Sequence, residues 1–345
     1  MRKLLGIGMI LIVMLAAIER DFLGWPEAAW SASESVIEVS CPDAEGCFSL
    51  LGQAIRQAPE GARLRIGPGV YYEKPLVVNK SVTLQGAGAL RTQIRLIDPD
   101  AVALAVEGRA LSVRIEDLTL QGGPFFSPSE RWDLWTGAAV LASGAAPDQS
   151  VQLRIERSQI LGWSGIALPG NVYLSLREST VIAQNVGILS LGSSIEVRDS
   201  RIESARSATK RGAGIDASFA ERVWVQNSLI RGYGTGISYA IPVPPEREPP
   251  EGGSLGELVA ISALVEQNDV GIFLAGPVGA RLEGNRVENN AQYGLLLALP
   301  PCVSTSEESR FRGAVHGAGN RFARNGQDLC PEDYPWPEGF IASTE

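Results

Sequence analysis

The strongest chemical signal in the sequence is an aromatic segment between Gly122 and Gly137, which reads GGPFFSPSERWDLWTG. Aromatic rings stack on sugar rings, and a few polar groups then fix the orientation of a bound ligand. The candidate ligand-binding residues are Phe125, Phe126, Arg131, Trp132, Asp133 and Trp135. We expect Tyr239 and the Pro-rich residues 241–253 to form the opposite wall of this surface. Packing of the rings onto the protein body is the alternative.

Asp216 is the candidate for acid–base chemistry, because the basic residues Lys210 and Arg211 shortly precede it. A catalytic role would pair the Asp216 carboxylate with the Arg211 guanidinium. A glycoside hydrolase normally needs two carboxylates about 5–10 Å apart, so one aspartate beside one arginine makes only a reduced site. An ion pair within a loop is the simpler interpretation of these two residues.

Metal ligands are scarce in this chain. His316 is the only histidine, and all three methionines lie within the first 14 residues. Copper prefers such soft ligands, so copper binding is not expected. We predict no metal site and no cofactor; calcium would be compatible with the composition, but no motif indicates it.

Four cysteines follow the N-terminal region, namely Cys41, Cys47, Cys302 and Cys330. An even number is typical of disulfides in an oxidising compartment. Pairing the first two and the last two would fasten each end of the chain, although the sequence does not fix the connectivity. Zinc binding is the alternative, but the spacings fit no common zinc finger.

The N-terminus has the pattern of a secretory signal peptide over residues 1–31. Arg2 and Lys3 precede an apolar run from Leu4 to Ile18, and small residues surround the expected cleavage site after Ser31. An uncleaved membrane anchor is the alternative. Either way, we expect the body of the protein to be extracytoplasmic, and no other stretch is long enough to span a membrane.

The charge balance argues against two classes of partner. Lys and Arg total 30, Asp and Glu total 39, and the net charge is therefore −9. An acidic chain without a basic cluster is a poor ligand for nucleic acid or for an anionic membrane surface. We expect a monomer that binds neither nucleic acid nor, apart from its N-terminal segment, a membrane.

A repeat of about 22 residues organises most of the chain. It is marked by glycines at positions 137, 165, 187, 214, 236, 271 and 294. Short alternating runs follow each glycine, and turn residues separate them, which is typical of stacked β-strands. A second series occupies one corner of successive units and predicts hydrogen bonding along the stack; it comprises Ser158, Ser179, Ser200, Ser228, Ala263, Asn285 and Asn320. Leucine-rich repeats have a similar period, but the helical half of each unit is missing.

The start of the repeat carries a family resemblance. A short amphipathic helix is predicted from Ser49 to Ala58, and the segments RLRIGPGVYYEK and PLVVNKSVTLQGAG follow it. This opening resembles that of the pectin-lyase-like, right-handed parallel β-helix proteins, which include pectin methylesterases and periplasmic NosD-type proteins. The resemblance implies a single-stranded right-handed parallel β-helix of about ten coils, all β except for a helix that caps one end.

In the enzymes with this fold, the groove is floored by outward residues of one sheet. Two and four positions after each repeat glycine, Asp216 is the only ionisable residue. The paired aspartates of polygalacturonases are absent, and so is the Asp-Pro-His motif of alginate epimerases. The resemblance therefore implies the fold more firmly than it implies a reaction.

These patterns divide the chain into four parts. Residues 1–31 are the signal peptide, 32–62 the lead-in and capping helix, 63–324 the β-helix, and 325–345 an irregular C-terminal cap closed by Trp336 and Phe340. The predicted function is non-catalytic binding or a structural role at the cell envelope, directed toward polysaccharide. The alternative is a carbohydrate-active enzyme, a polysaccharide lyase or glycoside hydrolase, with its groove near Asp216.

Overall fold

A computed structural model describes residues 35–41, 46–98, 101–122, 137–146, 149–205, 212–243 and 253–342. Within these ranges no helix combines the length and the apolar character needed to cross a membrane. The predicted signal peptide lies outside the described residues.

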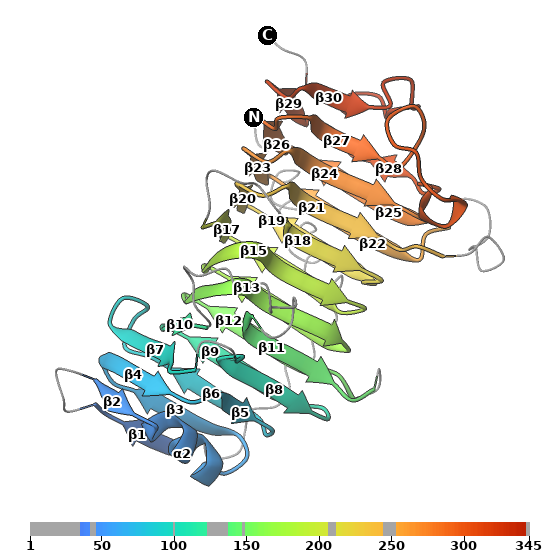
Figure 1. Cartoon of the computed structure of the whole chain (residues 1–345). Coiled ribbons are helices and arrows are strands. Elements are labelled where there is room, and N and C mark those ends of the chain that lie inside the picture. Colours follow the sequence, from blue (N-terminus) through green and yellow to red (C-terminus); the bar gives the residue numbers. More distant parts are fainter. Residues whose placement is uncertain are drawn as a thin grey trace, which may run out of the picture. The chain divides into compact units, whose positions relative to one another are not determined.

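The described chain winds into coils that each contribute a strand to as many as three parallel sheets (Figure 1). Sheet 1 has 11 strands. They are β1 (Val36–Val39), β3 (Ala62–Ile66), β6 (Val82–Gln85), β9 (Ser112–Glu116), β12 (Val151–Glu156), β14 (Val172–Arg177), β16 (Ser194–Arg198), β19 (Arg222–Gln226), β22 (Gly256–Ile261), β25 (Val278–Glu283) and β28 (Val315–His316).

Sheets 2 and 3 meet in the long strands β13 (Gln159–Gly170) and β15 (Thr180–Leu191), which run across both. Sheet 2 also contains β2 (Cys47–Phe48), β4 (Gly69–Glu73), β7 (Thr92–Leu96), β10 (Thr119–Gln121), β17 (Arg201–Ser204), β20 (Leu229–Arg231), β23 (Leu264–Glu266), β26 (Arg286–Glu288) and β29 (Arg321–Ala323). Sheet 3 also contains β5 (Leu76–Val78), β8 (Leu104–Gly108), β11 (Ala138–Gly144), β18 (Ala213–Ser218), β21 (Thr235–Ala240), β24 (Val270–Ala275), β27 (Tyr293–Leu297) and β30 (Gln327–Cys330).

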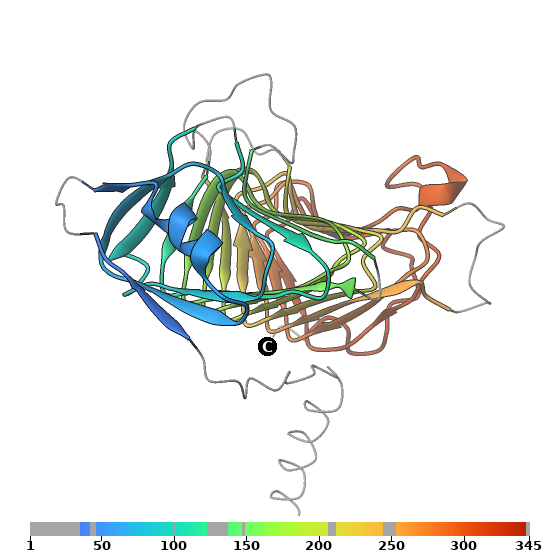
Figure 2. The ribbon, with the colours of Figure 1, turned by 90° about the horizontal axis from the view of Figure 1, so that it is seen from below.

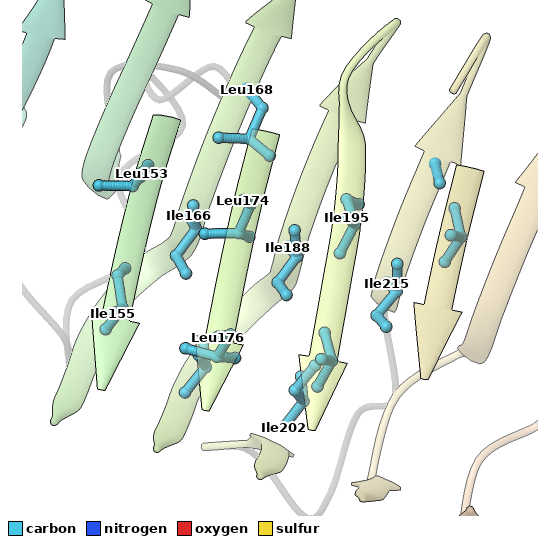
Figure 3. Packing of buried hydrophobic residues seen from close by; sticks show 14 of the residues in the cluster. Leu153, Ile155, Ile166, Leu168, Leu174, Leu176, Ile188, Ile195, Ile202 and Ile215 are labelled. Atoms are coloured by element: carbon cyan, nitrogen blue, oxygen red, sulfur yellow. The ribbon is translucent and has the colours of Figure 1, made fainter. Parts of the chain in front are cut away.

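The core lies inside the coils, where equivalent side chains stack from one coil to the next. Figure 3 shows Leu153, Leu174 and Ile195 of sheet 1 facing inward, toward the side of Ile166 and Ile188 in sheet 3. All five are at most 2% exposed. Strand alternation puts every second residue inside, and β12 follows it, with Val151, Leu153 and Ile155 buried.

The predicted serine corner is confirmed between sheets 1 and 2. The backbone N–H of Ser158 donates to Ser179 Oγ at 3.1 Å, and that of Ser179 donates to Ser200 Oγ at 3.2 Å. The residue before each serine, such as Arg157 or Glu178, is left-handed with φ of 47°. The series continues through Ala263, whose N–H donates to Asn285 Oδ1 at 2.9 Å. A sharp corner exposes backbone donors, and these side chains satisfy them.

The repeat glycines mark a close approach between coils. A Cβ added at Gly187 or Gly214 would lie within 3.0 Å of the carbonyl oxygen of the next glycine along the stack. It would also lie within 3.0 Å of a buried γ-methyl in sheet 2, that of Ile202 or Ile230 respectively. Only glycine leaves room for sheets 2 and 3 to join this closely.

Both ends of the stack are covered and held by disulfides. The helix α2 (Leu50–Gln57) buries Leu51 and Ile55 against the first coils (Figure 2), close to the predicted helix. At the other end Phe340 stacks on Phe322 and Trp336, so the predicted aromatic closure is confirmed. The disulfides Cys41–Cys47 and Cys302–Cys330 form as the end-fastening pairing predicts.

The stack is longer than predicted at both ends. β1 pairs with β3, and β2 pairs with β4, so the coils begin within the expected lead-in. β30 pairs with β27, so the irregular cap begins only after Cys330. The sequence boundaries at 63 and 325 were wrong because these short strands carry little alternation of their own.

Candidate functional site

The outward face of sheet 3 carries an almost uncharged column of side chains. The register places one member on each successive strand, in the order Val77, Ala105, Leu141, Ala167, Leu189, Asp216, Ser238, Phe273, Leu296 and Cys330. Asp216 is the only ionisable member, since Cys330 is in a disulfide. The repeat pattern predicts Ala139 rather than Leu141 here; this was wrong because the register pairs Leu141 with Ala167, so Gly137 stands two residues before the position equivalent to Gly165.

The other two sheets have charged outward faces. In sheet 1 Glu196, which is 3% exposed, pairs with Arg198 and with Arg177 at 3.1 Å. In sheet 2 Glu288 pairs with Arg286 and with Arg324 at 2.9 Å. Among the described residues, no ion pair involves a sheet 3 strand. Sheet 3 is therefore the face on which an uncharged ligand meets the least competition from arginine and glutamate.

Only part of the sheet 3 column is accessible. Ala167 and Leu189 are at most 3% exposed, and Leu296 is 6% exposed, so the column is covered at these points. Between them Asp216, Ser238 and Phe273 are partly exposed on β18, β21 and β24. Neighbouring strands lie about 4.8 Å apart, so these three side chains span about 10 Å along the stack. This accessible strip is the candidate functional site.

The strip has a second, shorter row beside it. Ser218 and Ala240 are partly exposed at the next outward position of β18 and β21, and Leu191 at the end of β15 is 38% exposed. The strip thus offers an aromatic ring, two hydroxyl groups and one carboxyl group on an otherwise small and apolar floor.

Asp216 is electrostatically unusual. Burial among its neighbours raises the pKa of the Asp216 carboxyl above its ordinary value. No hydrogen bond or ion pair joins it to another residue in the described part of the chain. The predicted partner, Arg211, lies outside the described residues, so the Asp216–Arg211 pair stays a prediction. An unpaired, partly desolvated carboxyl is costly, and such groups concentrate at functional sites.

A long connection, residues 299–314, lies beside the ends of β21 and β24. It is held there by hydrogen bonds: Val243 N–H donates to Glu308 O at 3.2 Å, and Gly276 N–H donates to Ser309 O at 3.1 Å. The Arg312 guanidinium also donates to Val243 O at 3.0 Å. These bonds fasten the connection to the residues that directly follow β21 and β24.

Tyr239 does not belong to the site. Its side chain is fully buried inside the coils, and its hydroxyl donates to Ala220 O at 2.7 Å. Burial, together with the nearby Glu257 and Glu221 carboxylates, raises the pKa of Tyr239. The prediction that Tyr239 contacts a ligand was wrong, because it stands at an inward position of β21.

The other candidate ligand residues, Phe125, Phe126, Arg131, Trp132, Asp133 and Trp135, lie outside the described residues, so their role in binding stays a prediction. Sequence reasoning missed Phe273 as a candidate ligand residue. Its signal was available, because Phe273 stands two positions after Gly271 and so shares the column of Asp216.

A cleft of about 520 Å³ opens at the C-terminal end of the same face. It is lined by Tyr293, Pro301, Cys302, Gln327, Cys330, Pro331, Glu332 and Asp333. Tyr293 and Gln327 are paired on β27 and β30, and Cys330 ends the sheet 3 column. Within the described ranges, no group of three or more His, Cys, Asp or Glu residues could hold a metal ion.

The sequence matches no protein-family model, and no curated protein matches it significantly. Solved structures do resemble the fold. The Dettilon tailspike protein aligns with a TM-score of 0.60 at 14% identity, over 84% of this chain and 55% of its own. This chain thus spans little more than half of the tailspike.

Two carbohydrate-active enzymes align over more of their own length. A Yersinia enterocolitica family 28 exopolygalacturonase gives a TM-score of 0.53 at 12% identity, over 90% of this chain and 68% of its own. A pectin methylesterase in complex with a hexasaccharide gives 0.50 at 13% identity, over 90% of this chain and 99% of its own. Identities this low establish the architecture alone. The chain has the fold of the right-handed parallel β-helix proteins of the pectin-lyase-like kind.

Proposed function

We propose that this protein binds polysaccharide along the accessible strip of sheet 3 without cleaving it. One observation carries the proposal: Asp216, Ser238 and Phe273 stand in line on three successive strands of sheet 3, the face on which the described residues form no ion pair. A glycan chain lying along the stack would meet all three in turn.

The chemistry of the strip suits a sugar. The Phe273 ring offers an apolar face for stacking, and the hydroxyls of Ser218 and Ser238 can donate to or accept from sugar hydroxyls. Asp216 would accept hydrogen bonds from one or two sugar hydroxyls. Such bonds are about twice as strong as neutral ones and would offset the cost of holding this carboxyl partly desolvated.

The fold and the compartment support the proposal. The neighbours include an exopolygalacturonase and a pectin methylesterase bound to a hexasaccharide, so the architecture accommodates glycans elsewhere. Two disulfides favour an oxidising environment. We propose an extracytoplasmic protein at or outside the cell surface.

The test measures binding of the purified full chain to a panel of neutral, basic and acidic polysaccharides, with new reducing or unsaturated ends read in the same samples. Phe273→Ala and Asp216→Asn should each weaken binding several-fold. Leu90→Ala, which truncates an exposed apolar side chain away from sheet 3, and Asp199→Asn, at a corner between sheets 1 and 2, are the matched controls. Equal binding by the wild type and all four variants would contradict the proposal.

A second candidate function rests on the raised pKa of Asp216. A carboxyl that keeps its proton nearer neutral pH is suited to act as a general acid. Among the described residues of the sheet 3 column Asp216 is the only carboxylate, so a two-carboxylate mechanism would need a partner from the flanking segments. New chain ends that appear with the wild type and disappear with Asp216→Asn would establish this enzyme and overturn the binding protein.

A further inference from the structure

The cleft beyond β27 is a continuation of the sheet 3 face. Thr235, Val270, Tyr293 and Gln327 form a partly exposed row at the start of successive strands, parallel to the column that contains Phe273. The cleft begins where this row reaches Tyr293. Tyr293 lies one strand further along the stack than Phe273 and three residues before Leu296, the partner of Phe273. A bound chain would therefore cross about 5 Å along the stack and about 10 Å along the strands to reach the cleft from Phe273.

The lining of the cleft combines flat apolar surfaces with acceptors. Tyr293, Pro301, Pro331 and the Cys302–Cys330 disulfide supply the apolar part. The polar part consists of Gln327, Glu332 and Asp333. The side-chain nitrogen of Gln327 donates to Leu329 O at 3.1 Å and to Glu332 Oε1 at 3.3 Å, so this amide is held in a fixed orientation.

The charged residues that line the cleft are all acidic. Glu332 and Asp333 are exposed carboxylates, and no Lys, Arg or His is among the lining residues. Two exposed charges of the same sign that lie about 4 Å apart repel each other by about 1 kcal/mol or more. A sugar with a carboxylate or sulfate group would meet this repulsion without a compensating cation. A sugar with hydroxyl or ammonium groups would donate hydrogen bonds to the same oxygens.

We infer that this cleft is an end subsite for a non-anionic sugar residue of the glycan bound on sheet 3. This inference rests on the proposed function and narrows it to a class of ligand. Tyr293 forms the stacking platform, and Gln327, Glu332 and Asp333 receive the hydroxyl or amino groups of the sugar. The volume of about 520 Å³ lies within the range of small-ligand pockets.

The experiment titrates the full chain by calorimetry with three oligosaccharides of equal length. These are cellohexaose, which is neutral, the hexamer of glucosamine, which is cationic, and hexagalacturonate, which is anionic. Wild type should bind the first two and bind hexagalacturonate at least about tenfold more weakly. Tyr293→Ala should weaken the first two about fivefold or more. Glu332→Gln with Asp333→Asn should weaken the glucosamine hexamer most and should strengthen hexagalacturonate.

Matched controls separate the cleft from the rest of the surface. Tyr173→Ala removes an exposed tyrosine from sheet 1, and Glu338→Gln removes an exposed carboxylate from the C-terminal cap outside the cleft. Both should leave every affinity unchanged. Thermal unfolding of each variant shows whether it keeps the wild-type fold, and Gln327→Ala offers a second probe of the cleft if Tyr293→Ala unfolds.

Failure of the cleft and failure of the proposed function give different results. If Phe273→Ala weakens binding but every cleft variant binds as wild type does, the end subsite is refuted and the sheet 3 strip stands. Tightest binding of hexagalacturonate would refute the charge preference. If none of the three oligosaccharides binds, both proposals are refuted.

Discussion

Asn325 Oδ1 accepts two hydrogen bonds from Asn290, one from its backbone nitrogen at 3.0 Å and one from its side-chain nitrogen at 2.9 Å. Asn290 repeats the arrangement one coil earlier, where its own Oδ1 accepts from Asn268 at 3.1 and 3.2 Å. The ladder begins at Tyr233, whose N–H donates to Asn268 Oδ1 at 3.0 Å. These amides satisfy the corner between sheets 2 and 3 in the last coils.

The centre of this ladder should be intolerant of truncation. Asn290→Ala would remove the acceptor of the Asn268 backbone N–H and the Nδ2 group that donates to the Val265 carbonyl at 3.2 Å. Each buried unsatisfied group costs about 1–3 kcal/mol, so the free energy of unfolding should fall by at least about 2 kcal/mol. Urea denaturation measures the loss. Asn79→Ala, at an exposed asparagine, should change it little.

The repeat glycines should be intolerant of a single methyl group. A Cβ at Gly214 would lie 2.7 Å from Gly236 O and within 3.0 Å of the Ile230 γ-methyl, so Gly214→Ala must push the coils apart. Overpacking of this kind costs about 1–3 kcal/mol. Gly279→Ala is the control, because its Cβ would meet the Ser254 hydroxyl no closer than 3.3 Å. Equal thermal unfolding midpoints for the two variants would contradict the packing explanation.

The sequence predicts the coils because the same residue types recur at equivalent positions of successive coils. The serine corner was predicted since the same residue type recurs at 158, 179, 200 and 228. The asparagine ladder at 268, 290 and 325 was missed because it occupies only the last coils. Two of the earlier coils have no break at this corner, since β13 and β15 each continue across it.

The site was less predictable for three physical reasons. Gly137 stands two residues before the position that the register makes equivalent to Gly165, and spacing counted from glycines cannot detect such an offset. Tyr239 has the composition of a ligand residue, but only its inward position shows that it fills the core. The cleft at Tyr293 depends on the cap after Cys330 folding back, which no periodicity encodes.

The helix α2 is capped from a neighbouring strand rather than from its own sequence. Ser49 makes no side-chain cap, whereas Glu73 Oε1 accepts from Leu51 N at 2.7 Å and Oε2 accepts from Gly52 N at 3.3 Å. Glu73→Ala should lower the free energy of unfolding by about 1–2 kcal/mol, the usual loss for a cap. Glu107→Ala, at an exposed glutamate on β8, is the matched control in the same denaturation series. A loss confined to Glu107→Ala would refute the cap.

Asp216→Asn should stabilise the protein at neutral pH while weakening glycan binding. Burial raises the pKa of the folded-state carboxyl above its unfolded value of about 3.9. A carboxyl whose pKa is higher in the folded than in the unfolded protein makes its full contribution to the free energy of unfolding below the unfolded-state pKa. This contribution is lost as the pH rises through the folded-state pKa. The free energy of unfolding of the wild type should therefore equal that of Asp216→Asn near pH 3 and become lower than it as the pH increases.

Urea denaturation of both proteins across this pH range measures the divergence. Asp199→Asn, at a carboxylate that accepts from Asn227 at 3.2 Å, should show no such pH-dependent gain. A wild type more stable than Asp216→Asn at neutral pH would mean that the carboxylate has a stabilising partner in the folded protein. The expected result instead means that the chain tolerates an unpaired carboxyl where a ligand can hydrogen-bond to it, which is the stability cost that binding sites characteristically carry.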